Sequence, residues 1–246
     1  MSVKIDDLST WPGDILEGLK SPHVRRYFAE SQSAEDVYDI AEVQAIGSAL
    51  VGHCYHAGLI GYHCTKEKRP GFFKGHGLEV TEPERKIEAF LNEFGTHLSE
   101  GKLGEVRRKF AEWLNNKGQM KGRRGKVWFC LTRNLVVSSG TGRFFKYYGG
   151  EIIYWPFAGR DPEVEALLER IGSPVVVELS LDPAEMVYFG DDNLAKSMLS
   201  YYGASVNPSF DLYDIEGYSK IPLPPKRIVE VHPQPAFFRT GGQYRS

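Results

Sequence analysis

Cysteine is scarce in this 246-residue sequence, and its three positions, Cys54, Cys64 and Cys130, offer no paired framework. A small secreted protein held together by disulfides normally carries an even set of cysteines, so the count favours a reducing compartment. The first residues also lack the basic and then apolar stretch of a secretory signal. We therefore expect a cytoplasmic protein, or one that is delivered into a target cell without a cleaved signal peptide.

Long apolar runs and an excess of one charge are missing as well. The most apolar region, residues 45–62, contains glycines together with His53 and His56, which makes it a poor membrane span. The formal net charge is −2, so the whole chain exerts no general attraction on polyanions. We expect no membrane partner, and a hydrophobic content of 41% is enough for a sizeable core.

The common phosphate and metal motifs are absent too. The glycine-rich stretch "GTGRFFKYYGG" lacks the Gly-Lys-Ser/Thr of a phosphate loop, and no clean Gly-x-Gly-x-x-Gly occurs. The spacing of His63, Cys64 and His76 matches no common zinc pattern, and there is no Cys-x-x-Cys. We expect neither a nucleoside-triphosphate loop nor a metal site.

Hydrophobic periodicity predicts an α+β protein. The first 52 residues have a helical pattern, in which Ser33 is a plausible N-cap of a helix over 33–50. Further helices are expected over 81–98, 103–118, 161–172 and 193–203. Strands are expected over 57–65, 126–132, 150–157 and 174–181, and the segment 213–233 is expected to hold two strands joined by a proline-rich turn.

Three segments in this order carry a resemblance to a known family. They are "GYHCTKEKRPGFFKGHGL" at 61–78, "GRFFKYYGGEIIY" at 142–154 and "DIEGYSKIPLPPKRIVEV" at 214–231. Together they resemble the signature segments of the NAD-dependent ADP-ribosyltransferase fold, which includes diphtheria-toxin-like enzymes, poly(ADP-ribose)-polymerase-like enzymes and bacterial toxins that modify nucleic acids. The resemblance implies a split antiparallel sheet core in a catalytic domain over 53–246. A helical region over 1–52 would pack on this core, and a basic helical insert would occupy 81–126.

The resemblance also implies roles for particular residues. The first segment offers His63 and Thr65 to NAD, the middle segment offers a tyrosine to stack on nicotinamide, and the last offers Glu216 as the catalytic carboxylate. Glu216, His63 and Tyr147 are the implied catalytic residues. The implied NAD-binding residues are His63, Thr65, Tyr147, Tyr148, Arg143 and Arg69, and Arg133 is a further candidate for the diphosphate.

Cleavage of the bond between ribose and nicotinamide explains why these residue types are wanted. Its transition state resembles an oxocarbenium ion, which a carboxylate such as Glu216 stabilises while it orients the attacking group. A neutral imidazole suits a ribose hydroxyl, and an aromatic ring stacked on nicotinamide excludes water. Glu151 and Glu178 are rivals of Glu216 for the carboxylate role, since both lie on expected strands.

The acceptor of ADP-ribose is suggested by local charge. Residues 101–126 hold nine Lys or Arg against two Glu, which favours RNA or DNA over protein, with a small molecule third. An antitoxin or inhibitor with an acidic surface would also fit this segment. Asp214 stands two residues before Glu216, where arginine-specific relatives carry Glu, and this departure argues against an arginine target.

Other classes of function remain open from the sequence. An enzyme of the same fold that transfers an RNA 2′-phosphate onto NAD would use a histidine and arginines without needing Glu216. A non-catalytic module would bind ADP-ribose or nucleic acid without releasing nicotinamide. In a plain α+β interaction protein, the side chains of His63, Tyr147, Tyr148 and Glu216 would have no common cleft.

Overall fold

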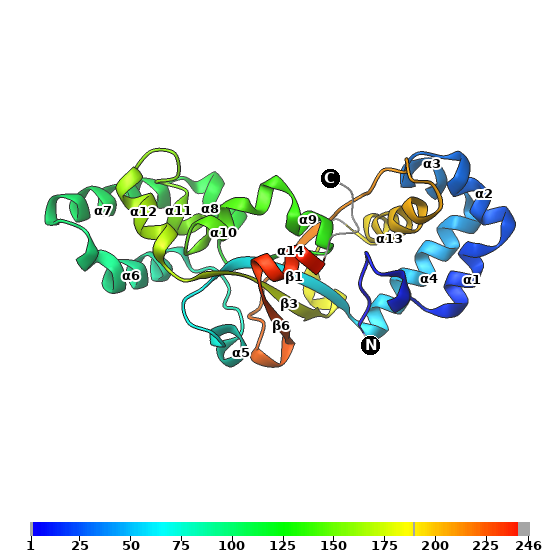
Figure 1. Cartoon of the computed structure of the whole chain (residues 1–246), viewed down its shortest axis with the longest axis horizontal. Helices are drawn as coiled ribbons and strands as arrows, with labels where there is room; N and C mark the ends of the chain where they lie inside the picture. Colours follow the sequence, from blue (N-terminus) through cyan, green and yellow to red (C-terminus); the bar gives the residue numbers. More distant parts are fainter. Residues whose placement is uncertain (1, 189, 241–246) are drawn as a thin grey trace. The chain divides into compact units, whose positions relative to one another are not determined.

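The computed structural model describes residues 2–188 and 190–240, and its chain divides into two compact units (Figure 1). The first unit comprises residues 2–63, 128–136 and 178–218, and the second comprises residues 64–127, 137–177 and 219–240. The chain therefore passes from one unit to the other several times. Within the described residues, the protein is α+β with helices α1–α14 and a six-stranded antiparallel sheet.

The first unit is built mainly from helices that precede the first strand. These helices are α1 (Gly13–Lys20), α2 (Pro22–Glu30), α3 (Ala34–Tyr38) and α4 (Ala41–Ala57), joined later in the chain by α9 (Arg133–Val137) and α13 (Asp191–Val206). Ser33 caps α3 as expected, in a capping box with Asp36. The single helix expected over 33–50 is divided, because α3 ends at Tyr38 and α4 begins at Ala41.

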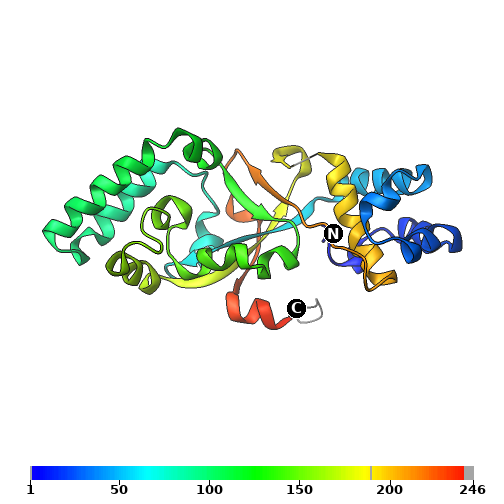
Figure 2. The same cartoon turned by 90° about the horizontal axis from the view of Figure 1, so that it is seen from above.

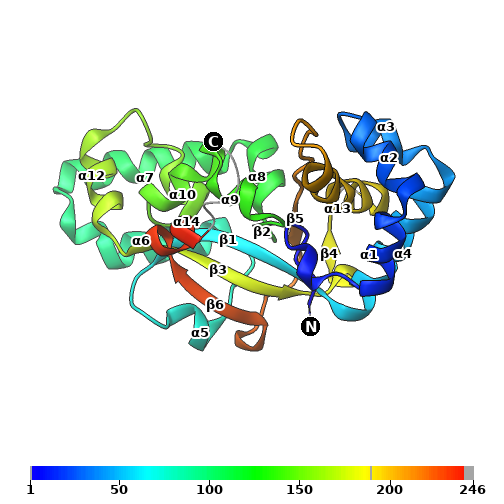
Figure 3. The same cartoon turned by 45° about the vertical axis from the view of Figure 1, so that its right-hand side comes forward.

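Helices α4 and α13 lie side by side in the first unit (Figures 1 and 3). Gly47 allows their close approach, because a Cβ atom there would lie 3.1 Å from the Cβ of Ala195 and 3.3 Å from a methyl group of Leu199. Gly58 then ends α4 with a positive φ of 79° and leads the chain into β1. These two glycines set the distance and the direction of the helix that delivers the first strand.

The second unit has a helical core of its own. Its helices are α5 (Phe72–His76), α6 (Pro83–Phe94), α7 (Glu100–Leu114), α8 (Lys117–Arg123), α10 (Gly142–Lys146), α11 (Gly150–Tyr154), α12 (Pro162–Arg170) and α14 (Gln234–Thr240). Helices α6 and α7 lie side by side (Figures 1 and 2). Buried side chains of α6, α7, α8, α11 and α12 form one aromatic-rich cluster, in which Phe110 and Phe157 pack edge to face with ring centroids 5.1 Å apart.

The sheet has the strand order β4-β5-β2-β1-β3-β6. Its strands are β1 (Leu59–Glu67), β2 (Val127–Cys130), β3 (Ser173–Leu181), β4 (Met186–Val187), β5 (Glu216–Ser219) and β6 (Ile228–Pro233). Strands β1 and β2 are antiparallel, with Tyr62 opposite Cys130. The expected strands near 57–65, 126–132 and 174–181 are confirmed, as are the two strands joined by the proline-rich segment near 213–233.

The strand expected over 150–157 is wrong, because this segment forms α11. Gly149 and Gly150 have positive φ values of 87° and 64°, and they turn the chain into the helix. The following residues Ile152, Ile153 and Tyr154 are all buried in the core of the second unit, whereas a half-buried strand would alternate. The run of apolar residues was therefore the inner part of a short helix, which periodicity does not separate from a buried strand.

Candidate functional site

The residues expected to bind NAD divide between the two units. His63 and Glu216 belong to the first unit, and the others belong to the second, namely Thr65, Arg69, Arg143, Tyr147 and Tyr148. His63 lies on β1 and Glu216 on β5, and in the sheet these strands are separated by β2. These two side chains, from distant parts of the sequence, thus come from two strands that flank β2.

His63 is held by the backbone of β2. Its Nδ1 lies 2.7 Å from the carbonyl oxygen of Trp128, and the side chain is half-buried. Because a carbonyl oxygen accepts hydrogen bonds, Nδ1 is the protonated nitrogen, and in the neutral ring Nε2 is then the acceptor. The strand continues to Glu67, so His63 lies within β1 rather than at the strand end that the sequence indicated.

Glu216 is the first residue of β5, and its side chain is exposed. The next residue, Gly217, allows β5 to pack closely on β2, since a Cβ atom there would lie 3.0 Å from the ring of Phe129. Because side chains alternate along a strand, Glu216 and Tyr218 lie on the face opposite to the one that Phe129 occupies. The pairing of Tyr62 with Cys130 sets His63 opposite Phe129, so His63 shares the face of Phe129 and not that of Glu216. Gly217 therefore sets which way the carboxylate of Glu216 is directed.

Trp128 and Tyr218 form an aromatic pair on β2 and β5. Their ring centroids are 4.7 Å apart with an interplanar angle of 48°, and both side chains are half-buried. Trp128 thus contacts His63 through its backbone and Tyr218 through its ring, and Tyr218 shares a face of β5 with Glu216. Neither aromatic residue was predicted from the sequence to belong to the site. The spacing could have indicated Tyr218, because residues two apart on a strand share a face and Tyr218 follows Glu216 by two.

Asp214 anchors the chain just before Glu216. Its carboxylate accepts hydrogen bonds from the hydroxyl of Thr132 at 2.5 Å, the amide of Asn134 at 2.5 Å and the hydroxyl of Tyr201 at 2.7 Å. Burial and the charge of Asp214 raise the pKa of Tyr201, so its phenol stays a donor. The carboxylate is therefore engaged in holding the chain at the start of β5.

Two further acids, Asp6 and Glu178, are buried in the first unit. The ammonium of Lys4 lies 3.0 Å from the carboxylate of Glu178, which is 5% exposed, and Asp6 accepts a hydrogen bond from the backbone N–H of Arg133. Burial raises the pKa of Asp6, and the bond from Arg133 offsets part of this rise. Burial, and then the charges of Asp6 and Glu178, raise the pKa of Tyr62. Glu178 therefore has an internal ion-pair role, which weakens it as a rival of Glu216.

The two tyrosines of the middle segment are parts of the core of the second unit. Tyr147 is 5% exposed, its hydroxyl donates to Glu165 at 2.7 Å, and its ring centroid lies 5.6 Å from that of Tyr154. The ring of Tyr148 packs edge-on against Phe94, and burial raises its pKa to about 12. The burial of Tyr147 argues against the stacking role expected of it, because its faces are covered by protein.

The charged residues of the same segment also have protein partners. The guanidinium of Arg143 lies 5.5 Å from the ring centroid of Trp155, while Glu151 forms an ion pair of 2.8 Å with Arg123. Arg123 in turn packs on the rings of Trp113 and Trp155. Glu151 therefore lies on a helix and holds an arginine on two tryptophans, which weakens it as a rival of Glu216.

Thr65 and Arg69 lie at the far end of β1 and just beyond it. Thr65 is half-buried on the strand, and Arg69 is exposed after the strand has ended. Both residues are in the second unit. Their expected contacts with NAD stay predictions.

The basic segment over 101–126 is partly neutralised by acids from other helices. Lys102 and Lys109 bind Asp161 at 2.8 and 2.9 Å, and Arg124 binds Glu84. Arg108 and Arg123 also have acidic partners. Within the part of the chain that the structure describes, Arg107, Lys117 and Lys121 are exposed cations with no carboxylate in ion-pair contact. The surface charge is thus smaller than the excess that the sequence alone suggests.

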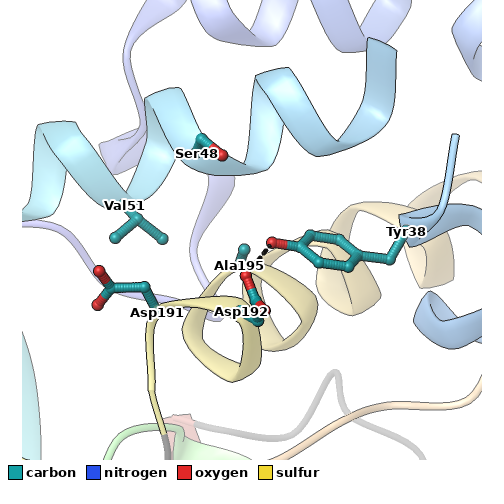
Figure 4. A pocket seen from close by; sticks show the side chains of 6 residues that line it. All are labelled: Tyr38, Ser48, Val51, Asp191, Asp192 and Ala195. Carbon is teal, nitrogen blue, oxygen red and sulfur yellow. Dashed lines mark hydrogen bonds between the residues drawn. The ribbon is translucent and has the colours of Figure 1, made fainter. Parts of the chain in front are cut away.

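The first unit also contains a small cavity of about 110 Å³ between α4 and α13. Figure 4 shows its lining residues, with the hydroxyl of Tyr38 donating to Asp192 at 2.9 Å. Burial and this hydrogen bond raise the pKa of Tyr38 to about 12. The cavity is far below the size of small-molecule sites, and we assign it no function.

The described residues contain no group of three or more His, Cys, Asp or Glu side chains suited to hold a metal ion. Among the same residues, no helix is both long enough and apolar enough to span a membrane.

No match was found among protein families, curated proteins or solved structures.

Proposed function

We propose that this protein is a mono-ADP-ribosyltransferase, which transfers ADP-ribose from NAD to a macromolecular acceptor. The observation that carries the proposal is the exposed carboxylate of Glu216 on β5 beside the aromatic pair of Trp128 and Tyr218, with His63 of the same unit on β1, on the other side of β2. Trp128 of β2 holds the imidazole through its carbonyl and packs on Tyr218, which shares a face with Glu216. The six-stranded antiparallel sheet is compatible with the split-sheet core that the resemblance implies.

The residues present suit the chemical groups of NAD. With Nδ1 donating to Trp128, Nε2 of His63 is the nitrogen that accepts a hydrogen bond from a ribose hydroxyl. The exposed carboxylate of Glu216 suits a ribose hydroxyl and the positive charge that develops at the anomeric carbon. In this proposal Tyr218 or Trp128, rather than Tyr147, supplies the ring that stacks on nicotinamide.

The proposed reaction is a substitution at the anomeric carbon. The bond from C1′ of the ribose to the nicotinamide nitrogen breaks, and its electron pair moves onto the nicotinamide. A new bond forms between C1′ and the acceptor nucleophile, whose proton passes to the carboxylate of Glu216 or to water. Asp214 is a positioning residue in this scheme, since three hydrogen bonds hold it two residues before Glu216.

We propose nucleic acid ahead of protein as the acceptor. The exposed cations Arg107, Lys117 and Lys121 support a phosphate-bearing acceptor. Ion pairs with acids reduce the net positive charge of the rest of the basic segment. A toxin, defence or effector protein would have such an activity, and an acidic antitoxin or inhibitor is a fitting partner for the same cations.

Transfer of label from NAD tests the proposal. Purified protein is incubated with NAD labelled in the adenylate part, together with total RNA, DNA or lysate protein. We expect label on one acceptor class, and a loss of about 10²- to 10⁴-fold in Glu216→Gln. Glu17→Gln is the matched control, because Glu17 is exposed on α1 and far along the chain from the site. Equal activity of Glu216→Gln and wild type would instead favour a 2′-phosphotransferase-like enzyme.

A further inference from the structure

The second unit contains a larger, open cavity of about 430 Å³ that the proposed function does not use. Its volume falls in the range of small-molecule sites. The cavity lies at the ends of α6 and α12, and it combines apolar, aromatic and charged side chains. Its lining residues are Lys68, Glu93, Phe94, His97, Leu167, Arg170, Ile171 and Gly172.

The rings of Phe94 and His97 form one wall of the cavity. The rings of Phe94 and His97 have centroids 6.3 Å apart with an interplanar angle of 37°. The ring of Phe94 contacts those of Phe90, with centroids 5.6 Å apart, and Tyr148, with centroids 5.7 Å apart; Phe90 is in the core of the second unit and Tyr148 packs against that core. A supported ring at the edge of an open cavity is suited to stacking a flat ligand group.

The lining of the cavity has two cations, Lys68 and Arg170, against one acid, Glu93. Lys68 contacts both carboxylate oxygens of Glu93, at 2.6 and 2.9 Å, and both side chains are partly exposed. Within the described residues, the guanidinium of Arg170 has no carboxylate partner, and its Nε donates to the carbonyl of Ala166. A phosphate between Lys68 and Arg170 would take the place of Glu93 beside the ammonium.

The end of α12 would repel an anion if its last carbonyl groups were open. Lys66, 5% exposed, lies beneath this end and donates to the carbonyl oxygens of Leu168 and Glu169 at 3.3 and 2.5 Å. Its ammonium therefore covers the negative end of the helix from the interior. Gly172 completes the turn with a positive φ of 68°, where a Cβ atom would lie 2.7 Å from the carbonyl oxygen of Glu67.

We infer that this cavity is a binding site for a nucleotide unit, with the base against Phe94 and His97 and the phosphate at Arg170 and Lys68. The site is separate from His63 and Glu216, which are in the first unit. A base next to a phosphate is the shared chemistry of a free nucleotide and of a nucleotide in a single strand of RNA. The inference stands without the proposed transferase activity.

Calorimetric titration without NAD tests the site. The probes are AMP, adenosine, inorganic phosphate and a single-stranded hexa-adenylate RNA. We expect saturable binding of AMP, and binding at least about tenfold weaker for adenosine and for phosphate alone. Hexa-adenylate that binds at least about tenfold more tightly than AMP identifies the strand as the source, and equal or weaker binding identifies the free nucleotide.

Variants place the binding in this cavity. Arg170→Gln is expected to weaken AMP binding about tenfold and to leave adenosine unchanged, whereas His97→Ala weakens both. Both residues are exposed, so the substitutions leave the core intact, and Arg160→Gln is the exposed control on the same unit. AMP bound at the proposed NAD site would respond to His63→Ala and not to Arg170→Gln, which would overturn the inference. The absence of saturable AMP and RNA binding would overturn it as well, while label transfer from NAD would be unaffected.

Discussion

The polar side chains close to Glu216 in the first unit are held differently from the charged side chains around the core of the second unit. In the first unit, backbone and hydroxyl groups fix single polar side chains, as the Trp128 carbonyl fixes His63 and three donors fix Asp214. In the second unit, acids pair with lysines and arginines around an aromatic core, as Asp161 pairs with Lys102 and Lys109. Fixed, singly oriented groups suit catalysis, whereas ion pairs around a core suit stability and binding.

The largest expected loss of stability comes from a substitution in the core of the second unit. Phe157 is fully buried, and it contacts the ring of Phe110 and the ammonium of Lys109. Phe157→Ala should cost about 3–5 kcal/mol of unfolding free energy, because it leaves a cavity. Hydrogen exchange should show lost protection in α6–α8 and α10–α12 and retained protection in α4 and α13. Equal loss in both units would contradict their separate stability.

The next effect is the pH dependence of the stability that Asp161 contributes to the second unit. Burial alone would raise the pKa of Asp161, but hydrogen bonds from Lys102 and Lys109 bring it below the usual value. Ionised Asp161 therefore contributes its full share to the free energy of unfolding above the usual aspartate pKa of about 4. This contribution is lost as the pH falls through the lower pKa that Asp161 has in the folded protein. Asp161→Asn should cost about 2–4 kcal/mol at neutral pH, because the buried carboxylate is lost and, among the described residues, the two partly buried ammonium groups keep only Glu105 as a carboxylate partner.

Asp6 in the first unit should show the opposite sign. Its pKa is raised, chiefly by burial, so the folded state binds the proton more tightly than the unfolded chain. The associated stability is present at low pH and is lost as pH rises through the raised value. Denaturant unfolding of Asp6→Asn and Asp161→Asn between pH 3 and 7 should give changes of opposite slope. Parallel slopes would show that the two acids do not differ in this way.

A smaller effect on stability should accompany the loss of the anchor before Glu216. Asp214→Asn removes charge from an acceptor of three hydrogen bonds and should cost about 1–3 kcal/mol. Label transfer should fall more than NAD affinity, since Asp214 positions Glu216 and does not touch NAD in the proposed scheme. Asp211→Asn, on the same segment and exposed, is the control for both measurements. An equal loss of stability and label transfer in Asp214→Asn and Asp211→Asn would contradict the role of Asp214 in positioning Glu216.

The smallest effect is expected at the surface of α7. Arg108 and Glu112 form an ion pair one helical turn apart, and both side chains are 62% exposed. Arg108→Ala should change the unfolding free energy by at most about 0.5 kcal/mol, because such pairs are screened by solvent. Thermal unfolding at low and high salt checks this value. A change above about 2 kcal/mol would mean that the ion pairs of the second unit act as a network.

Much of the fold could be predicted from the sequence, because local rules decided it. The Ser33 cap, the helix with Pro83 in its first turn and the strands at β1, β2 and β3 follow from capping and periodicity. The helix α11 could not, because an apolar run after two glycines suits both a short helix and a strand. A role for His63 was predicted from its segment and stays a prediction, and its orientation depends on the carbonyl of Trp128, 65 residues away.

The remaining parts of the site depend on contacts that no local pattern contains. Tyr147 belongs to an aromatic segment that suits a ligand, yet Glu165 and Tyr154 hold it in the core. Asp214 gains its role from residues 132, 134 and 201, which the fold alone brings together. The sequence could thus name residue types for the chemistry, but not which of them are already engaged by the protein.

The proposed catalytic role of Glu216 is tested by measuring NAD binding and nicotinamide release side by side in wild type and Glu216→Gln. The account predicts that both proteins bind NAD with dissociation constants within about threefold, because one uncharged isostere removes little ground-state binding. It also predicts that the variant releases nicotinamide about 10²- to 10⁴-fold more slowly. A wild-type protein that binds no NAD, or a variant that releases nicotinamide at the wild-type rate, would contradict the assignment of Glu216 and the transferase proposal that rests on it.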